Sequence, residues 1–288
     1  MPLSTPPPAE QKLDLREKGA PSAGETQATD RRLYMQLQAF GGCADPAALR
    51  KALESRGVEG VLYLDLHDPQ GVSILFISEE PEWFVREGRE ILAGDPFNRL
   101  QRKPELAMFG RTYATGREQD VEDWLLAKPR RAALNPAWPW AVWYPLRRKA
   151  EFALLSKEEQ GTILAEHAKL GIAYGQSGYA TDIRLSCYGL DTNDNEFVLG
   201  LIGPALQPLS SLIQDMRRTQ QTARFIQSMG PFFIGRACWQ SPLRPLDSPA
   251  FGGVARDVAP QKSRGRPERA KRVEGPWSSG QDREAPHG

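Results

Sequence analysis

The first half of the chain, residues 31–128, alternates strand and helix patterns. The expected elements are a strand, a helix, two strands, a helix and a strand, at 33–40, 46–56, 61–67, 72–78, 82–92 and 106–114. Apolar and polar residues alternate in 33–40, as they do in a half-buried strand. Asp45 is suited to an N-cap and Gly57 to the end of a helix, while the turn residues at 68–71 join two strands into a hairpin. The predicted order is β-α-β-β-α-β.

The second half, residues 129–236, repeats this order. The expected elements are 140–147, 156–170, 183–190, 196–202, 205–225 and 232–235. Two ferredoxin-like βαββαβ units give two four-stranded antiparallel sheets, which pack face to face or close into one barrel. We therefore predict an α+β fold of tandem ferredoxin-like repeats that form a dimeric α+β barrel. The Pro- and Trp-containing residues 116–138 are expected to be an ordered connection.

The two ends of the chain lack hydrophobic periodicity. Residues 1–30 are rich in Pro, Glu, Gln, Ser and Gly, and residues 237–288 in turn formers and basic residues, so we expect a disordered leader and a disordered basic tail. No stretch has the character of a signal peptide or the roughly 18 apolar residues of a membrane span. The three cysteines show no CxxC spacing, which fits reduced thiols. We expect a cytoplasmic protein without a membrane partner.

Charge adds one feature, which lies in the tail. The formal net charge of the 288 residues is +1, with both signs mixed through the middle of the chain. That balance does not favour a nucleic-acid-binding core. Arg264, Gly265, Arg266 and Pro267 resemble an AT-hook, which enters the A·T minor groove. A solvated basic tail explains the same residues, and we favour that interpretation.

His167 is the histidine with a candidate function. His287 lies in the tail, and His67 ends a strand beside a turn. Ser156 and Glu159 form a predicted capping box, and the helix that they begin carries an apolar stripe of Ile163, Leu164, His167 and Leu170. An inward-facing imidazole is either a hydrogen-bonded core residue or a metal ligand. No second histidine or thiolate has a metal-site spacing, so a single axial ligand to a macrocycle is favoured over a zinc site.

Three ordered stretches resemble one family. WYPLRRKAEFALLSKEEQGTILAEHAKLGIAYG, IRLSCYGLDTNDNEFVLGLIG and MRRTQQTARFIQSMGPFFIGR are similar to the C-terminal half of chlorite dismutase family proteins. The resemblance implies the tandem ferredoxin-like fold over about 31–236, with haem held in the C-terminal half. It implies that His167 is the proximal iron ligand. It also implies a homo-oligomer, since rings of five subunits are common in the family.

The family divides mainly into chlorite-degrading enzymes and coproheme decarboxylases, and the latter use peroxide to convert two propionates of iron coproporphyrin into vinyls. Tyr144 precedes Pro145 and matches the tyrosine that forms a radical in the decarboxylases; a barrel tyrosine bonded to the backbone is the alternative. Arg148 falls where decarboxylases carry a lysine that holds a propionate, and a guanidinium preserves that role. A solvated charge pair is the alternative for Arg148. Arg111 and Tyr113 are further candidates for propionate contact.

Two positions depart from the family pattern. Chlorite dismutases have an arginine, and many decarboxylases a glutamine, where this sequence has Asp182. Arg184 lies on the same strand face and is a candidate replacement, as is Gln176 from the preceding loop. Chlorite chemistry needs a cation at this position, and an aspartate repels the anion. On the proximal side, Gln220 stands where the family commonly has a glutamate bonded to the ligand histidine, so the imidazole is expected to push less electron density to iron.

The sequence therefore favours a haem-binding oxidoreductase that decarboxylates coproheme with hydrogen peroxide. The expected cofactor is haem, either iron coproporphyrin or haem b, and the expected partners are porphyrin and peroxide. A non-enzymatic haem carrier or sensor and a chlorite dismutase are the alternatives.

Overall fold

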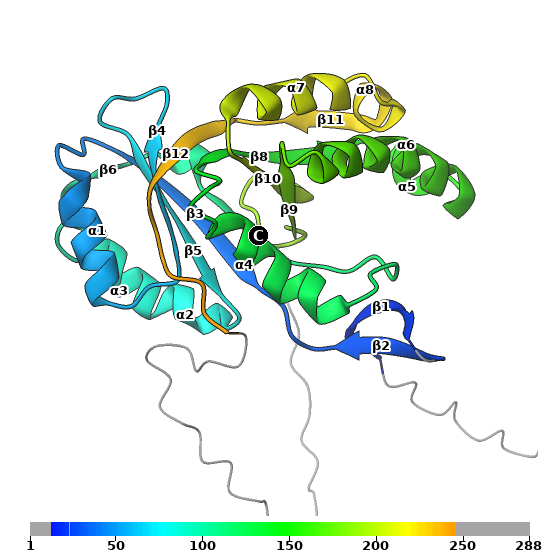
Figure 1. Ribbon diagram of the computed structural model, residues 1–288, viewed down its shortest axis with the longest axis horizontal. Coiled ribbons are helices and arrows are strands. Elements are labelled where there is room, and N and C mark those ends of the chain that lie inside the picture. The colour runs from blue at the N-terminus through cyan, green and yellow to red at the C-terminus, as the bar shows by residue number, and fades with distance from the viewer. Residues whose placement is uncertain (1–12, 23, 246–288) are drawn as a thin grey trace, which may run out of the picture. The chain divides into compact units, whose positions relative to one another are not determined.

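Strands from both halves of the chain close into one ring in the computed structural model, which describes residues 13–22 and 24–245 (Figure 1). The ring strands are β3 (Tyr34–Gly41), β4 (Gly60–Asp65), β5 (Val72–Ser78), β7 (Met108–Arg111), β8 (Trp140–Arg148), β9 (Thr181–Ser186), β10 (Phe197–Gly203) and β12 (Phe233–Gln240). Their order is β10-β9-β7-β3-β5-β4-β12-β8, and β8 pairs with β10 to close the ring. Two short strands, β6 (Gln101–Arg102) and β11 (Ile226–Met229), pair with β3 and β8. Of the two arrangements that the sequence allowed, the structure adopts the closed barrel.

Each half contributes one ferredoxin-like sheet. The N-terminal sheet runs β7-β3-β5-β4 and the C-terminal sheet runs β12-β8-β10-β9, with antiparallel neighbours throughout. The halves join where β4 pairs with β12 and where β7 pairs with β9. The α+β fold of tandem ferredoxin-like repeats is therefore confirmed.

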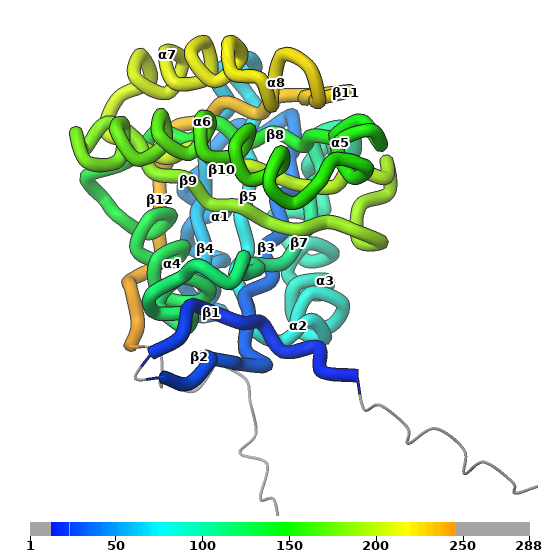
Figure 2. The backbone as a smooth tube through the Cα atoms, turned by 90° about the vertical axis from the view of Figure 1, so that its right-hand side faces the viewer, coloured from blue at the N-terminus to red at the C-terminus, as the bar shows by residue number. Residues whose placement is uncertain are grey.

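Helices cover the outside of the barrel in two groups (Figure 1, Figure 2). On the N-terminal sheet lie α1 (Pro46–Ser55), α2 (Pro81–Val85) and α3 (Glu87–Ala93), followed by the short turns η1 (Phe97–Arg99) and η2 (Pro104–Leu106). The C-terminal group is α5 (Glu151–Leu154), α6 (Lys157–Gln176), α7 (Leu206–Met216) and α8 (Gln220–Phe225). Among the helices within 13–22 and 24–245, none is long and apolar enough to cross a membrane.

Side-chain alternation divides the core into layers. On β8, Ala141 and Trp143 are fully buried inside the barrel, whereas Val142 and Tyr144 face the helices outside. The barrel interior also receives Leu125 and other residues of the connection, whose π-helical turn η3 (Asp123–Ala127) leads into α4 (Lys128–Ala133). The connection is thus ordered, as the sequence predicted. Because the interior is filled by side chains, a ligand site has to be sought on the outer face.

Three expectations about the chain ends and helix bounds differ from the structure. The disordered leader is wrong for residues 17–29, which form a hairpin of β1 (Glu17–Ser22) and β2 (Glu25–Thr29). The boundary at residue 236 falls inside β12. The predicted helix over 205–225 is two helices, since Thr219 caps α8 by accepting a hydrogen bond from the Thr222 N–H. The AT-hook-like residues lie outside the described ranges.

Candidate functional site

The predicted capping box places His167 on α6. The Ser156 hydroxyl accepts a hydrogen bond from the Glu159 N–H at 3.2 Å, and the Glu159 carboxylate accepts one from the Ser156 N–H at 2.9 Å. This fixes the helix start and the rotation of every later residue. His167 is half-buried as a result, on the side of α6 that faces the barrel.

One imidazole nitrogen of His167 is held by Thr219. The Nδ1 atom lies 3.2 Å from the Thr219 hydroxyl oxygen, which is itself 2.8 Å from the carbonyl oxygen of Met216. A hydroxyl has one proton, and we assign it to the nearer acceptor, the Met216 carbonyl. Nδ1 then donates to Thr219, so the lone pair of the ring is on Nε2. Within the described part of the chain, Nε2 has no hydrogen-bond partner.

The surroundings keep the imidazole neutral. Burial lowers the pKa of His167, and the positive charge of Arg184 lowers it further, against the opposing effects of Asp182 and Glu166. A neutral ring with a fixed tautomer is the form in which histidine binds a metal.

The outer face of β8, β10 and β9 lies opposite this helix, since Leu170 and Tyr174 of α6 pack on its apolar cluster, and we call the facing residues of α6 and of that sheet face the helix–sheet site. In the sheet register, Leu199 of β10 is flanked by Tyr144 of β8 and by Arg184 of β9. At the usual spacing between strands, the Cα atoms of Tyr144 and Arg184 are about 10 Å apart. Two predicted catalytic residues therefore lie in one row across the sheet.

Tyr144 has an apolar environment that keeps its phenol protonated. The ring stacks on Phe232 with centroids 4.7 Å apart, and the residue is 6% exposed. Burial raises the pKa of Tyr144 strongly, and the negative charge of Asp182 adds to this rise, whereas Arg217 opposes it. No hydrogen bond of its hydroxyl occurs within residues 13–22 and 24–245. The alternative, a barrel tyrosine whose hydroxyl is bonded to the backbone, is therefore not observed for Tyr144 among the described residues.

Asp182 and Arg184 form an ion pair on β9. The Arg184 Nε atom lies 2.8 Å from the Asp182 carboxylate, and both side chains are partly exposed. Both lie on the outer face, because Ile183 between them points into the barrel core. Gln176, the third candidate for this position, is the last residue of α6 and is exposed. The structure thus brings Asp182 and Arg184 into the helix–sheet site as a pair.

Tyr113 and Arg148 approach the site from one edge. The Tyr113 ring packs on Phe197 at 5.6 Å, and burial raises its pKa while the charges of Arg184 and Arg148 oppose that rise. Arg148 lies between the rings of Phe152 and Phe197, 4.7 Å from each centroid. Its Nε atom donates to Glu196 at 2.9 Å. Arg148 is therefore near the site but already paired.

Two predicted contacts point elsewhere. Arg111 pairs with Glu17 of β1 at 2.6 Å, which connects it to the N-terminal hairpin. Gln220 is exposed, and its backbone N–H donates to Glu166 at 2.9 Å. The partner of the His167 Nδ1 atom is Thr219, one residue earlier, because α8 begins there instead of continuing α7.

Arg217 is a site residue that the pattern of the sequence did not reveal. It follows α7 as its C-cap, is exposed, and is close enough to Tyr144 for its charge to affect the pKa of that phenol. No ion pair of Arg217 occurs within the described ranges, whereas Arg218 beside it pairs with Asp215 at 3.9 Å. The sequence marks Arg217 only as a basic residue at the end of a helix. Such residues are common, so the pattern does not single it out as a site residue.

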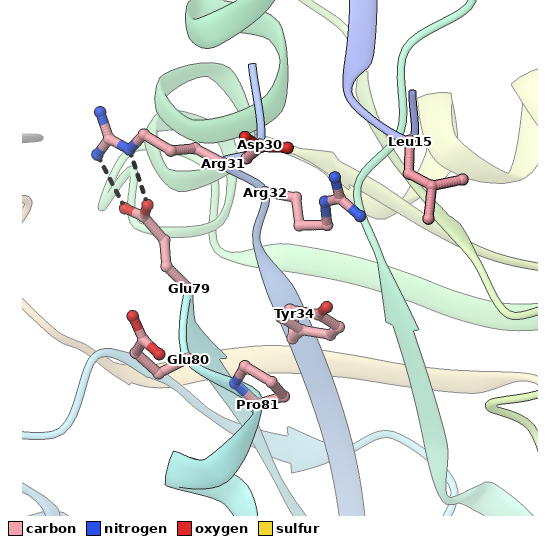
Figure 3. A pocket seen from close by; sticks show the side chains of 8 residues that line it. All are labelled: Leu15, Asp30, Arg31, Arg32, Tyr34, Glu79, Glu80 and Pro81. Atoms are coloured by element: carbon pink, nitrogen blue, oxygen red, sulfur yellow. Dashed lines mark hydrogen bonds and ion pairs between the residues drawn. The ribbon is translucent and has the colours of Figure 1, made fainter. Parts of the chain in front are cut away.

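A hollow elsewhere on the protein is unrelated to these residues. It has a volume of about 410 Å³ and lies beside β3 (Figure 3). Arg31 turns there toward Glu79, to which it is paired at 3.0 Å, while Arg32 and Tyr34 lie to one side (Figure 3). None of the predicted site residues lines this hollow.

A model of the chlorite dismutase family matches residues 125–238. These residues are a chlorite dismutase family domain. The match includes β8, α6, β9 and α8, so it contains Tyr144, His167, Asp182 and Thr219. Arg111 and Tyr113 precede it.

Comparison with solved structures shows that the similarity in fold extends beyond residues 125–238 to the whole barrel. A haem-binding protein of Thermus thermophilus is 18% identical over 72% of this chain and 91% of its own, with a TM-score of 0.56. Chlorite dismutase from Candidatus Nitrospira defluvii, solved in complex with imidazole, is 14% identical over 73% of this chain and 92% of its own, with a TM-score of 0.55. At these identities the likeness establishes the fold. No curated protein matches the chain.

Proposed function

We propose that the chain is a haem-binding oxidoreductase in which His167 is the axial ligand to iron. The observation that carries this proposal is the contact of the His167 Nδ1 atom with the Thr219 hydroxyl at 3.2 Å, since the assignment of the hydroxyl proton to the Met216 carbonyl leaves Nε2 with its lone pair. A porphyrin supplies four nitrogen ligands of its own, so one protein nitrogen completes the attachment. The family of residues 125–238 and the haem-binding protein of the same fold agree with this assignment.

The helix–sheet site suits a flat apolar ligand. Over its 20 residues α6 buries only Ile163, although Leu170 and Tyr174 contact the cluster on the sheet. The opposite face carries the partly buried Leu199 beside Tyr144 and Phe232, so an aliphatic and aromatic cluster lies where a macrocycle would pack. Helix and sheet therefore provide the two sides that a porphyrin needs.

We propose peroxide-dependent decarboxylation of iron coproporphyrin as the reaction. Bound iron porphyrin with peroxide supplies a two-electron oxidant. The Tyr144 phenol, protonated and free of hydrogen-bond partners, gives up an electron and a proton and then takes a hydrogen atom from the propionate chain. Loss of a second electron and of CO₂ leaves the vinyl group, while one hydrogen peroxide and a further proton become two waters. Two propionates consume two peroxides.

Mass spectrometry of the porphyrin before and after peroxide tests this reaction. With iron coproporphyrin bound, we expect a mass loss of two CO₂ and four hydrogen atoms, reached through a one-vinyl intermediate. Tyr144→Phe keeps the ring stacked on Phe232 and is expected to bind the substrate without converting it. Unchanged coproporphyrin after several-fold excess peroxide would exclude the reaction while leaving haem binding intact.

Arg217 is proposed to hold a propionate at the open side of the site. A guanidinium without an ion-pair partner is available for a bidentate bond to a carboxylate. We expect Arg217→Ala to weaken binding of iron coproporphyrin about tenfold, since a hydrogen bond to a charged group contributes about 1.5–3 kcal/mol. Absorbance titration measures this. Arg218→Ala is the matched control, and equal weakening in both variants would contradict a specific contact.

A haem carrier or sensor is the second candidate, and the Thr219 contact favours it. A hydroxyl accepts the Nδ1 proton without the negative charge of a carboxylate, so His167 donates less electron density to iron. Oxidation by a bound iron porphyrin would then be less favoured. Stable haem binding with no consumption of coproporphyrin, peroxide or chlorite is the outcome that selects this candidate.

A further inference from the structure

A second cation joins the Asp182–Arg184 pair from the connection between the halves. The Lys128 ammonium lies 3.8 Å from one oxygen of the Asp182 carboxylate, and Arg184 contacts the other oxygen. Lys128 is the first residue of α4, directly after the π-helical turn η3. One carboxylate therefore faces two cations.

Trp124 fixes both cations in place. The Lys128 nitrogen is 3.9 Å from the centre of the indole ring, and the Arg184 guanidinium carbon is 4.9 Å from it. The indole N–H donates to the carbonyl oxygen of Tyr113 at 3.0 Å, which sets the orientation of the ring. Trp124, Lys128, Asp182 and Arg184 form what we call the β9 charge cluster.

Asp182 reduces the positive charge of this cluster. Its carboxylate offsets one of the two positive charges, and neither cation has another ion pair within residues 13–22 and 24–245. Asp123, another carboxylate on the connection, is bound to Arg131 at 2.7 Å. Without Asp182, two cations would face the helix–sheet site, where their attraction for an anion is strong.

We infer that Asp182 determines which small ligands reach the iron, favouring uncharged ligands such as hydrogen peroxide over anions such as chlorite. This inference rests on the haem binding proposed above. Arg184 lies in the same row across the sheet as Tyr144, on the sheet that faces the helix carrying His167, so the cluster would border the side of a bound porphyrin that is turned away from His167. Paired with Asp182, Arg184 and Lys128 are held away from an incoming anion.

Ligand titration of the full chain loaded with ferric haem tests the inference. Azide is the anionic probe and imidazole the neutral one, both followed by the Soret band. We expect Asp182→Asn, which keeps the size of the side chain, to bind azide about tenfold more tightly, with imidazole changed by less than about twofold. Lys128→Met in the Asp182→Asn background is expected to reverse part of the gain.

Asp194→Asn is the matched control, because Asp194 is 94% exposed and pairs with Arg147 outside the cluster. The inference is overturned if azide affinity does not rise in Asp182→Asn, if Asp194→Asn raises it equally, or if imidazole tightens in parallel with azide. Failure of the wild-type chain to bind ferric haem is a different result. It would remove the proposed function as well, and the two failures are thereby distinguished.

Discussion

Replacing His167 with alanine is expected to abolish specific haem binding. His167 is the one histidine of α6. Its contact with Thr219 fixes the orientation of the ring, so that its second nitrogen is available to iron. Removal of an outer partner of a metal-bound histidine typically costs 10–100-fold in affinity, so loss of the ligand itself should cost more than about 100-fold. Titration of ferric haem into the purified chain, followed by absorbance, measures this.

Two further variants separate iron ligation from non-specific haem adsorption. His67→Ala removes an exposed imidazole just after β4 and should leave binding unchanged. Thr219→Val removes the acceptor of the Nδ1 proton at similar size, and we expect a loss of about tenfold. Haem binding by His167→Ala with an unchanged Soret band would show that another residue ligates the iron.

Replacing Gly60 with alanine is expected to destabilise the barrel by about 3 kcal/mol. Gly60 begins β4 opposite Phe76 of β5, and a Cβ atom there would overlap the backbone carbonyl oxygen of Leu75. The backbone has no side-chain rotamer with which to move away, so the pairing of β4 with β5 must shift. Urea unfolding of the full chain measures the loss in the free energy of unfolding. The two proteins are compared with the same m-value, the slope of that free energy against urea concentration.

Gly161→Ala is the control, and its expected effect has the opposite sign. Gly161 lies inside α6, and the nearest heavy atom to an added Cβ is a guanidinium nitrogen of Arg117 at 3.9 Å, an ordinary contact. Alanine in a helix interior is favoured over glycine by about 1 kcal/mol. A Gly60→Ala protein as stable as wild type would show that β4 and β5 separate at this point without cost.

Local signals in the sequence predict much of the fold. Asp45 caps α1 through the Ala47 N–H, and the Ser156–Glu159 box begins α6, both as predicted. The β1–β2 hairpin escaped prediction because its contacts are distant in sequence: Glu17 binds Arg111, and Gln27 binds the backbone of Gln119. A polar segment of that kind has no periodicity to detect.

The candidate site was predictable to a lesser degree. His167 follows from helix spacing and Arg184 from strand alternation relative to Asp182, whereas Tyr144 and Asp182 were implied by the family resemblance; the structure gathers all four in the helix–sheet site. The resemblance implied Gln220 as the partner of the ligand histidine, but the break between α7 and α8 places Thr219 there instead. A threonine that precedes a polar helix start is an N-cap signal, and it would have placed the break. Lys128 and Trp124 could not be predicted, since their partners are on β9. Homo-oligomerisation and a cytoplasmic location stay predictions of the sequence.

The place of β12 in the ring has a consequence for biosynthesis. This strand pairs with β4 of the N-terminal sheet and with β8 of the C-terminal sheet, and it ends at Gln240. A ribosome therefore produces every other strand of the ring before the one that joins β4 to β8. Until then, the outer edge of β4 has unpaired backbone groups and is open to wrong partners. The nascent chain should depend on chaperone protection most during this interval, after β4 and before β12.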